Sequence, residues 1–568
     1  PYSFFWFDLL PAQESAGLQA APPEFLTLVM PRNWADLFRQ HTQPQLENEA
    51  IPAFLPRQRW FGEKDQRIKG AAVRAHGEIV HQFEDGSGSE TFLAAVVEAQ
   101  LAAGARPRYF LPLTAIWSPA ETELRLGLIP VTLAELRQSR KEGALVDALS
   151  QDGFALAIID AIQREATVPL DGGEIRCRKT PSFDQSALPE RFVVRRASTE
   201  QSNSSVFFEE YGMLKLYRRL QPGPHPEIEM SRFLVERAGF ANTPPLLATL
   251  EIALDGESGA EEHALGVLFG FVRNQGDGWT QALNYLTRYL DDALLSPGED
   301  PSALADPDVF FLMLARQLGI RTAEMHRALA EHAGDHPDFV PEPVTPEDIA
   351  EWRDELADSA TRMLSGLERG QSSLPAVARD LADRILALRE RLFEHIRGLI
   401  PDHVEAQKTR YHGDFHLGQV IVVQNDFFII DFEGEPARPL AARRRKGSPL
   451  RDVAGMIRSF DYAAVAAVRQ LAEARPPAEL RMAELAEAWR QRAVDGFRAA
   501  YRKTMRGCAA YPASKKQARD MTAFFQLEKA VYEVSYELAN RPTWVDIPLK
   551  GILAILEKTE KAERAAAA

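Results

Sequence analysis

The residues best suited to chemistry lie between positions 409 and 433, where charged loops alternate with short apolar runs. The stretch Tyr411-His-Gly-Asp-Phe-His-Leu-Gly-Gln419 precedes two apolar runs that predict a β-hairpin, and the second run leads into Asp431-Phe-Glu433. Asp414 comes five residues before Gln419. Two carboxylates and one amide on loops around a hairpin are typical of magnesium-dependent phosphoryl transfer.

The chemistry of phosphoryl transfer predicts a role for each of these polar groups. A hydroxyl that attacks a phosphoryl group must lose its proton, and we predict that Asp414 accepts it. Mg²⁺ prefers hard oxygen ligands, so we predict Asp431 and the amide oxygen of Gln419 as its protein ligands. His412 is expected to brace the loop. His416 lies between two apolar residues and is expected to pack or hydrogen-bond, and we also count it among the candidate substrate-binding residues.

Each of these motifs has a simpler interpretation when it is taken alone. His412-Gly-Asp414 could be an ordinary turn, and Asp431 could cap a strand. The combination favours an active site, because the spacing from Asp414 to Gln419 is that of the aspartate and asparagine in the catalytic loop of protein kinases. Those kinases carry Asp-Phe-Gly where this chain has Asp431-Phe-Glu433.

An ATP-binding half is therefore expected upstream of this segment. Strand-like runs at 191–195, 206–208 and 213–217 enclose a polar segment at 199–205, which is the order of a kinase small lobe. The polar segment lacks glycine, but its hydroxyl and N–H donors could still bind phosphate groups. We predict as nucleotide-binding residues Gln201, Ser202, Asn203, Ser204, Ser205 and the strand lysine Lys215.

A lysine on an edge strand often serves only to prevent sheet-to-sheet aggregation, so a functional role for Lys215 requires a carboxylate partner. Pro226 begins a predicted helix that carries Glu227 and Glu229 in its first turn. Either glutamate could pair with Lys215, and we favour Glu229, although an acidic first turn also complements the helix dipole. The strand-like run 265–273 then ends in a glycine-rich turn where two lobes could be hinged.

Several further motifs make the chain similar to bacterial maltokinases from about residue 25 to residue 560. They are Leu55-Pro-Arg-Gln-Arg-Trp-Phe-Gly62, Gly276-Asp-Gly-Trp279, Ser459-Phe-Asp-Tyr-Ala463 and the segment 527–541. The resemblance implies an α+β, bilobal, eukaryotic-type kinase-like fold, related to aminoglycoside phosphotransferases, with an N-terminal β-rich cap domain. It also implies that ATP and Mg²⁺ are used to phosphorylate maltose at its anomeric hydroxyl. The product, maltose 1-phosphate, would feed α-glucan (glycogen) synthesis.

The acceptor sugar is expected beside Asp414. Glu528, Tyr532 and Tyr536 lie four residues apart and would share one face of a helix. That periodicity alone favours an ordinary surface helix whose tyrosines pack inward. With the resemblance added, we predict Glu528 and Tyr532 as maltose ligands. The basic run 443–446 could steer ATP or simply form a solvated loop.

The predicted domains follow from these assignments. The first ten residues resemble the last strand of the C-terminal β-domain of trehalose synthase, an enzyme often fused to maltokinase, although a plain amphipathic strand is an alternative. The predicted boundaries are a remnant at 1–10, a linker at 11–24, the cap at 25–187, the small lobe at 188–275, the helical large lobe at 276–560 and a tail at 561–568. Amphipathic helices are predicted at 306–333, 345–369, 374–400 and 477–505.

Composition agrees with an enzyme of two or three domains. The chain has 568 residues, 45% of them hydrophobic, and its net charge of −15 argues against a nucleic-acid partner. The two cysteines are far apart in sequence, and no apolar run has transmembrane length, so we expect a cytoplasmic protein. Two alternatives stay open: a kinase for another sugar or amino sugar such as glucosamine, or a nucleotide-binding pseudokinase that regulates a fused trehalose synthase.

Overall fold

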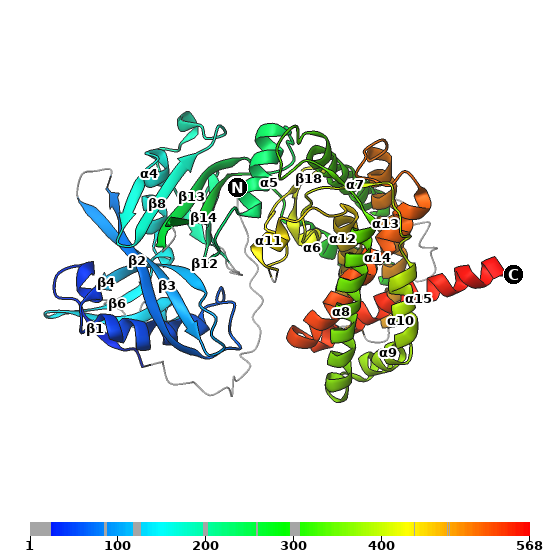
Figure 1. Cartoon of the computed structure of the whole chain (residues 1–568), viewed down its shortest axis with the longest axis horizontal. Coiled ribbons are helices and arrows are strands. Elements are labelled where there is room, and N and C mark those ends of the chain that lie inside the picture. The colour runs from blue at the N-terminus through cyan, green and yellow to red at the C-terminus, as the bar shows by residue number, and fades with distance from the viewer. Residues whose placement is uncertain are drawn as a thin grey trace.

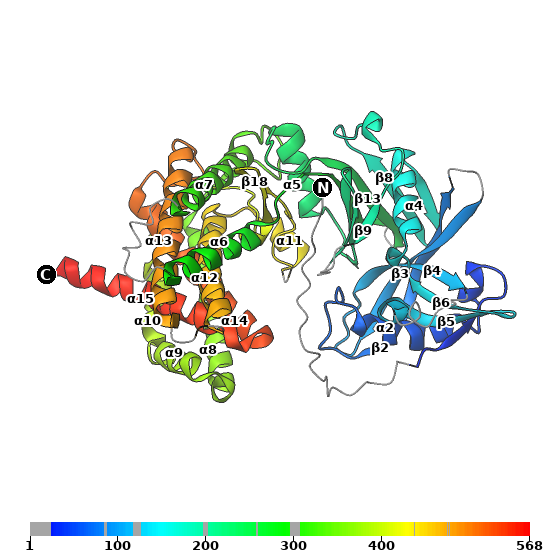
Figure 2. The ribbon, with the colours of Figure 1, turned by 180° about the vertical axis from the view of Figure 1, so that it is seen from behind.

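A β-rich half and a helical half lie side by side in this computed structural model (Figure 1). Figure 2 shows the same separation from behind, with α5 and α11 between the two halves. The structure describes residues 24–83, 88–117, 127–196, 203–256, 259–295, 307–436, 438–473, 475 and 478–567. The predicted remnant of a preceding domain at 1–10, nearly all of the linker and residues 197–202 lie outside the described residues.

The first sheet belongs to the predicted cap. Its strands run in the order β1-β5-β6-β4-β3-β2, and β12 pairs with β4. A helical segment at 43–57 and the aromatic residues Trp60 and Phe61 cover one face, so the motif at 55–62 is part of the core of the cap. The strands are β1 (Thr27–Val29), β2 (Ile68–Gln82), β3 (Ser89–Leu101), β4 (Arg108–Trp117), β5 (Thr132–Gln138), β6 (Lys141–Asp147) and β12 (Arg219–Leu220).

The second sheet carries the predicted small lobe and runs in the order β7-β8-β13-β14-β11-β10-β9. Helix α4 (Asp152–Gln163) precedes the first of its strands in the sequence, and helix α5 (Pro226–Arg232) lies between β12 and β13. The strands are β7 (Thr167–Leu170), β8 (Gly173–Lys179), β9 (Val194–Arg196), β10 (Asn203–Phe208), β11 (Gly212–Tyr217), β13 (Leu246–Gly256) and β14 (Gly259–Gly270).

Strand pairing in this sheet differs from the sequence-based expectation in two respects. Strands β7 and β8 pair with the small-lobe sheet, although both precede the predicted domain boundary at 187/188. Residues 203–205 were expected in a polar loop, yet they belong to β10, because Asn203 and Ser205 pair with Tyr217 and Lys215 of β11. The β10–β11 hairpin therefore includes residues 203–205, although their polar side chains indicated a loop.

The helical half confirms three of the predicted long helices, those at 306–333, 345–369 and 477–505. The helix predicted at 374–400 breaks at Leu388 into two pieces. Helix α8 begins with a capping box, in which the Thr345 hydroxyl accepts from the Asp348 N–H at 3.2 Å and Pro346 opens the first turn. The helices are α6 (Gly278–Leu295), α7 (Pro307–Glu331), α8 (Pro346–Gly370), α9 (Ala376–Ala387), α10 (Arg389–Gly398), α11 (Leu440–Arg443), α12 (Leu450–Ala472), α13 (Glu479–Thr504), α14 (Lys515–Asn540) and α15 (Asp546–Ala567).

Short strands complete this half. The strands β15 (Glu342–Pro343) and β16 (Gln407–Lys408) form one pair, and β17 (Val420–Val423) and β18 (Asp426–Ile429) form the hairpin predicted from the two apolar runs. Among the described residues, every helix is too short or too polar to cross a membrane.

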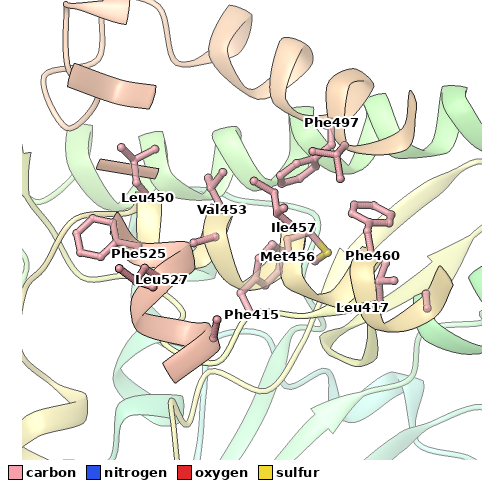
Figure 3. Close-up of a cluster of buried hydrophobic side chains, with 14 of the residues drawn as sticks. Phe415, Leu417, Leu450, Val453, Met456, Ile457, Phe460, Phe497, Phe525 and Leu527 are labelled. Atoms are coloured by element: carbon pink, nitrogen blue, oxygen red, sulfur yellow. The ribbon is translucent and has the colours of Figure 1, made fainter. Parts of the chain in front are cut away.

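Helix α12 supports the segment that carries Asp414. Figure 3 shows Val453, Met456 and Ile457 of this helix beside Phe415 and Leu417 of that segment, within one buried cluster that also includes side chains of α13 and α14. Gly455 makes the contact close, because a Cβ atom there would lie 2.6 Å from the carbonyl oxygen of Phe415. The packing at Gly455 and in the apolar cluster therefore fixes the distance between α12 and the segment that carries Asp414.

We expect Gly455→Ala to destabilise the protein by about 1–3 kcal/mol, because backbone atoms on both sides of the contact must shift. Urea denaturation measures the free energy of unfolding. Gly366→Ala in α8 is the matched control, since its Cβ would meet only Leu538 Cδ1 at 3.5 Å. Alanine there should be neutral or stabilising by up to about 1 kcal/mol. Equal stability of the two variants would contradict this account of the loop.

Candidate active site

The β17–β18 hairpin brings Gln419 and Asp431 together. Gln419 ends the short helix η9 (Leu417–Gln419), and its backbone carbonyl accepts from the Ile430 N–H at 3.0 Å. Its side-chain amide donates to Asp431 Oδ2 at 2.9 Å, which leaves the amide oxygen as an acceptor. Asp431 has a φ of 67°, a left-handed conformation that aspartate adopts more readily than most residues. The two predicted metal ligands thus lie side by side.

Lys215 of β11 lies within a group of three carboxylates. Its Nζ atom is 2.7 Å from Asp431 Oδ1, 3.0 Å from Glu227 and 2.5 Å from Glu433 Oε1. Burial alone would lower the pKa of Lys215, but the surrounding carboxylates outweigh it and raise the pKa well above its ordinary value. The ammonium group therefore stays charged.

The three carboxylates around Lys215 differ in how their pKa values are shifted. Burial raises the pKa of Glu227 and of Glu433. Burial also opposes ionisation of Asp431, but the ammonium of Lys215 outweighs it and lowers the pKa of Asp431. Oxygen atoms of these three residues lie within 4.8 Å of one another, and hard carboxylate oxygens are the donors that suit Mg²⁺. The donor set at this point therefore fits a magnesium ion.

The prediction that Glu229 pairs with Lys215 is wrong. Glu227 is the partner, with 1% of its surface exposed, and it also accepts from the Tyr217 hydroxyl at 2.6 Å. Residues two positions apart on an α-helix differ by about 200° around the helix axis, so the side chain of Glu229 points away from Lys215. It accepts two hydrogen bonds from Arg444 at 2.7 Å and lies 3.4 Å from Arg410.

Asp414 faces a lysine from a distant helix. Lys529 of α14 places its Nζ atom 3.2 Å from Asp414 Oδ1. Burial alone would raise the pKa of Asp414, but Lys529 and the imidazole of His416 lower it below its ordinary value. The carboxylate is therefore ionised and able to accept a proton near neutral pH.

Asp452 of α12 holds the loop that carries Asp414. Its carboxylate accepts from the backbone N–H groups of His412 at 2.7 Å and Gly413 at 2.9 Å. His326 of α7 contacts the same carboxylate at 2.9 Å. The side chain of Asp452 therefore holds this loop in place. His412 braces the loop from the other side, since its Nε2 atom lies 2.9 Å from the Ile430 carbonyl oxygen.

A pocket beside Asp414 is lined by residues of α12, α14 and the loop after β18. Each lining carboxylate is engaged with a cation or an N–H group: Glu528 with Arg451, Glu435 with Arg438 at 2.7 Å, and Asp414 with Lys529. Tyr532 lines the pocket, with its ring beneath the Lys529 ammonium, and its ring also stacks on Tyr536, which is 45% exposed. The structure thus brings the predicted residues Glu528 and Tyr532 into one pocket with Asp414.

The remaining predicted residues lie around the group of carboxylates at Lys215 and the pocket beside Asp414. His416 caps η9, where its Nδ1 atom accepts from the Gly418 N–H at 3.0 Å, so its ring is used within the loop. The Asn203 amide donates to Glu433. The Ser204 hydroxyl is buried against Arg218, so a contact from Ser204 to a nucleotide would use its backbone, and Ser205 lies opposite Lys215. Gln201 and Ser202 lie outside the described residues.

The basic run at 443–446 forms structural ion pairs. Arg444 pairs with Glu229, Arg445 with Glu351 and Lys446 with Glu342. Arg443 instead donates to the Pro436 and Arg438 carbonyls at 2.8 Å and lies in the pocket wall.

Sequence reasoning missed three residues that complete the site, which are Glu433, Glu435 and Lys529, and it named Glu227 only as the less favoured partner of Lys215. A signal existed for Glu433, which follows Asp431 by two residues and therefore shares its surroundings. Lys529 precedes Tyr532 by three residues and shares its helix face, but 115 residues separate it from Asp414. Only the folded chain reveals that pair.

Comparison with known proteins gives two matching family models. The maltokinase N-terminal cap domain matches residues 54–150, and the phosphotransferase enzyme family matches residues 191–485. A glucosamine kinase of Streptacidiphilus jiangxiensis is 26% identical over 351 residues, which cover 61% of this chain and 70% of that protein. A glucosamine kinase of Mycolicibacterium smegmatis is 24% identical over 412 residues, which cover 72% of this chain and 89% of that protein.

Solved structures agree on the fold. A glucosamine kinase in complex with glucosamine, ADP and inorganic phosphate is 21% identical, with a TM-score of 0.55 over 93% of this chain and 100% of that chain. A second crystal form of a glucosamine kinase gives a TM-score of 0.56. The predicted kinase-like fold with an N-terminal cap is thereby confirmed. The family match spans residues 191–485 of 568, more than half of the sequence, so this chain belongs to the phosphotransferase enzyme family and is maltokinase-like, with a maltokinase cap domain.

Proposed function

We propose that this chain is a kinase that transfers the γ-phosphoryl group of ATP to the anomeric hydroxyl of maltose, giving maltose 1-phosphate and ADP. The proposal rests on two groups of residues, which are the carboxylates around Lys215 and the pocket beside Asp414. Lys215 and the carboxylates around it suit a nucleotide and its metal ion, and Asp414 faces a pocket on the acceptor side.

The protein groups have distinct roles in this proposal. Asp414 accepts the proton of the attacking hydroxyl and orients it. Lys215, held by Glu227, pairs with the phosphates. Asp431 and Gln419 would hold Mg²⁺, and Glu433 lies close enough to Asp431 to contribute a further oxygen. When bound, the metal ion neutralises charge on the phosphate oxygens. Lys529 keeps Asp414 ionised and places a positive charge where the phosphoryl group meets the acceptor.

The charges of the acceptor pocket favour a neutral sugar. An ammonium group on an amino sugar would need a carboxylate free to pair with it. Among the described lining residues, Asp414, Glu435, Glu528 and Asp452 each already meet a cation or an N–H group. Tyr532 lines the pocket and its ring stacks on the half-exposed Tyr536, so the pair offers an aromatic surface on which a second glucose ring would pack.

Glucosamine is the second candidate acceptor, because the related proteins reported above are glucosamine kinases of 26% and 24% identity. A pseudokinase is a weaker alternative, since Lys215, Asp414, Gln419 and Asp431 are all present and Asp431 contacts both Lys215 and Gln419. We also propose, from the sequence resemblance alone, that the chain acts in the cytoplasm in α-glucan synthesis and works with a fused or associated trehalose synthase.

We expect selective turnover of maltose when ATP consumption with Mg²⁺ is measured on maltose, glucose, glucosamine, trehalose and an aminoglycoside. NMR of the product should locate the phosphate on the anomeric oxygen. Preferred turnover of glucosamine would overturn the acceptor assignment while keeping the kinase, and absence of turnover on every acceptor would favour the pseudokinase.

Asp414→Asn should lower kcat by about 10²–10⁴-fold, because the amide cannot accept the proton of the attacking hydroxyl. The affinity for ADP with Mg²⁺, measured by calorimetry, should stay nearly unchanged. Collapse of nucleotide binding in this variant would mean that Asp414 belongs to the nucleotide site and is not the base.

Lys529→Met should move the acidic limb of the kcat/KM profile to higher pH. The carboxylate must be ionised to act, and without the ammonium the burial of Asp414 raises its pKa. Lys516→Met, on an exposed position of the same helix, is the matched control and should leave the limb in place. An acidic limb that stays fixed in Lys529→Met would show that Asp414 does not control it.

A further inference from the structure

Arg218 lies at the junction between the cap and the small lobe, and 1% of its surface is exposed. It follows β11 directly and precedes β12, whose residues pair with β4 of the cap. Side chains alternate along a strand, so Lys215 and Tyr217 point to one face, where both contact Glu227. Arg218 points to the opposite face, toward the cap.

The Arg218 guanidinium contacts both domains at once. Its Nη2 atom donates to Asp147 Oδ2 at 2.7 Å, and its Nε atom donates to Ser204 Oγ at 2.8 Å. The ring of Trp60 lies 4.9 Å from its Cζ atom. Asp147 and Trp60 belong to the cap, whereas Ser204 belongs to β10. One buried cation therefore joins the cap to the strand that borders the nucleotide site.

The strand that Arg218 holds carries groups of the proposed nucleotide site. Asn203, next to Ser204, donates its side-chain amide to Glu433. Ser205, on the other side, lies opposite Lys215 in the β10–β11 register. A shift of β10 would therefore move both the residue that touches Glu433 and the strand partner of the phosphate-binding lysine.

The contacts of Arg218 require an arginine. A planar guanidinium can donate in two directions and still cover an aromatic face, whereas a lysine would offer one compact ammonium group. Burial of an ion pair adds little net stability compared with apolar packing, but it fixes the directions of its members. The pair between Arg218 and Asp147 is thus suited to positioning.

We propose that Arg218 is a positioning residue through which the cap domain holds β10, and with it the phosphate-binding face of the β10–β11 hairpin. The inference goes beyond the proposed function and rests on one part of it, the binding of a nucleotide at Lys215. It does not depend on which sugar is the acceptor.

The decisive variant is Asp147→Asn, because Asp147 lies in the cap and does not line the nucleotide site. Asparagine keeps the oxygen that accepts from the Leu149 N–H at 3.0 Å, while the charge that pairs with Arg218 is lost. We expect the affinity for ADP with Mg²⁺, measured by calorimetry on the full chain, to fall by about 2- to 30-fold. The KM for ATP should rise in parallel, with the KM for the acceptor unchanged.

Ser204→Ala is a second variant, which removes the other contact of Arg218 with a smaller change. It should weaken ADP binding in the same direction. Glu261→Gln is the matched control, because the Arg108–Glu261 ion pair also joins the cap sheet to the small-lobe sheet but lies at an exposed edge. It should leave ADP binding and both KM values unchanged.

Three results would overturn the inference. The first is unchanged ADP affinity in folded Asp147→Asn and Ser204→Ala. The second is an equal loss in Glu261→Gln, and the third is a rise in both KM values that follows the loss of thermal stability, which would indicate a merely structural role. If the wild-type protein binds no ADP, the proposed function fails and this inference falls with it; failure in the variants alone overturns only the inference.

Discussion

The ion pair between Lys215 and Asp431 joins the two halves of the molecule, and the candidate site depends on it. Lys215 comes from the small-lobe sheet and Asp431 from the hairpin of the helical half, and their charged atoms meet at 2.7 Å. A buried cation without its partner costs several kcal/mol, so the lysine fixes where the hairpin can lie. Glu227 and Glu433 complete the cluster, and burial raises the pKa of both, so Asp431 is the carboxylate most stabilised as an anion.

In the pocket beside Asp414, buried carboxylates are likewise balanced by neighbouring cations. Asp414 is ionised because Lys529 outweighs the effect of burial, and Glu528 is balanced by Arg451. A pocket whose carboxylates are already paired gains little by admitting another cation, since each new pair would displace an existing one. Hydroxyl groups, by contrast, can share such carboxylates and guanidinium groups as hydrogen-bond partners. This contrast is the physical basis for proposing a neutral sugar as the acceptor.

Local patterns allowed much of this architecture to be predicted from the sequence. The spacing of Asp414, Gln419 and Asp431 and the apolar runs between them identified a hairpin that the structure contains. The choice between Glu227 and Glu229 failed because it depends on the rotation of α5 about its axis, which is set by packing against the sheet. Lys529 was missed for a similar reason, since no local rule relates α14 to a loop 115 residues away.

The cap and the kinase lobes are coupled by the backbone as well as by side chains. Arg219 and Leu220 pair with β4, and the Phe110 N–H donates to the Arg218 carbonyl at 2.8 Å, so the chain leaving the lysine strand becomes an edge of the cap sheet. Only Leu216 and Tyr217 lie between Lys215 and Arg218, so this short piece of extended backbone has little length in which to absorb a displacement. Any movement of the cap relative to the small lobe must therefore either break this pairing or carry β11 with it. The cap is consequently joined through the backbone to the strand that carries Lys215.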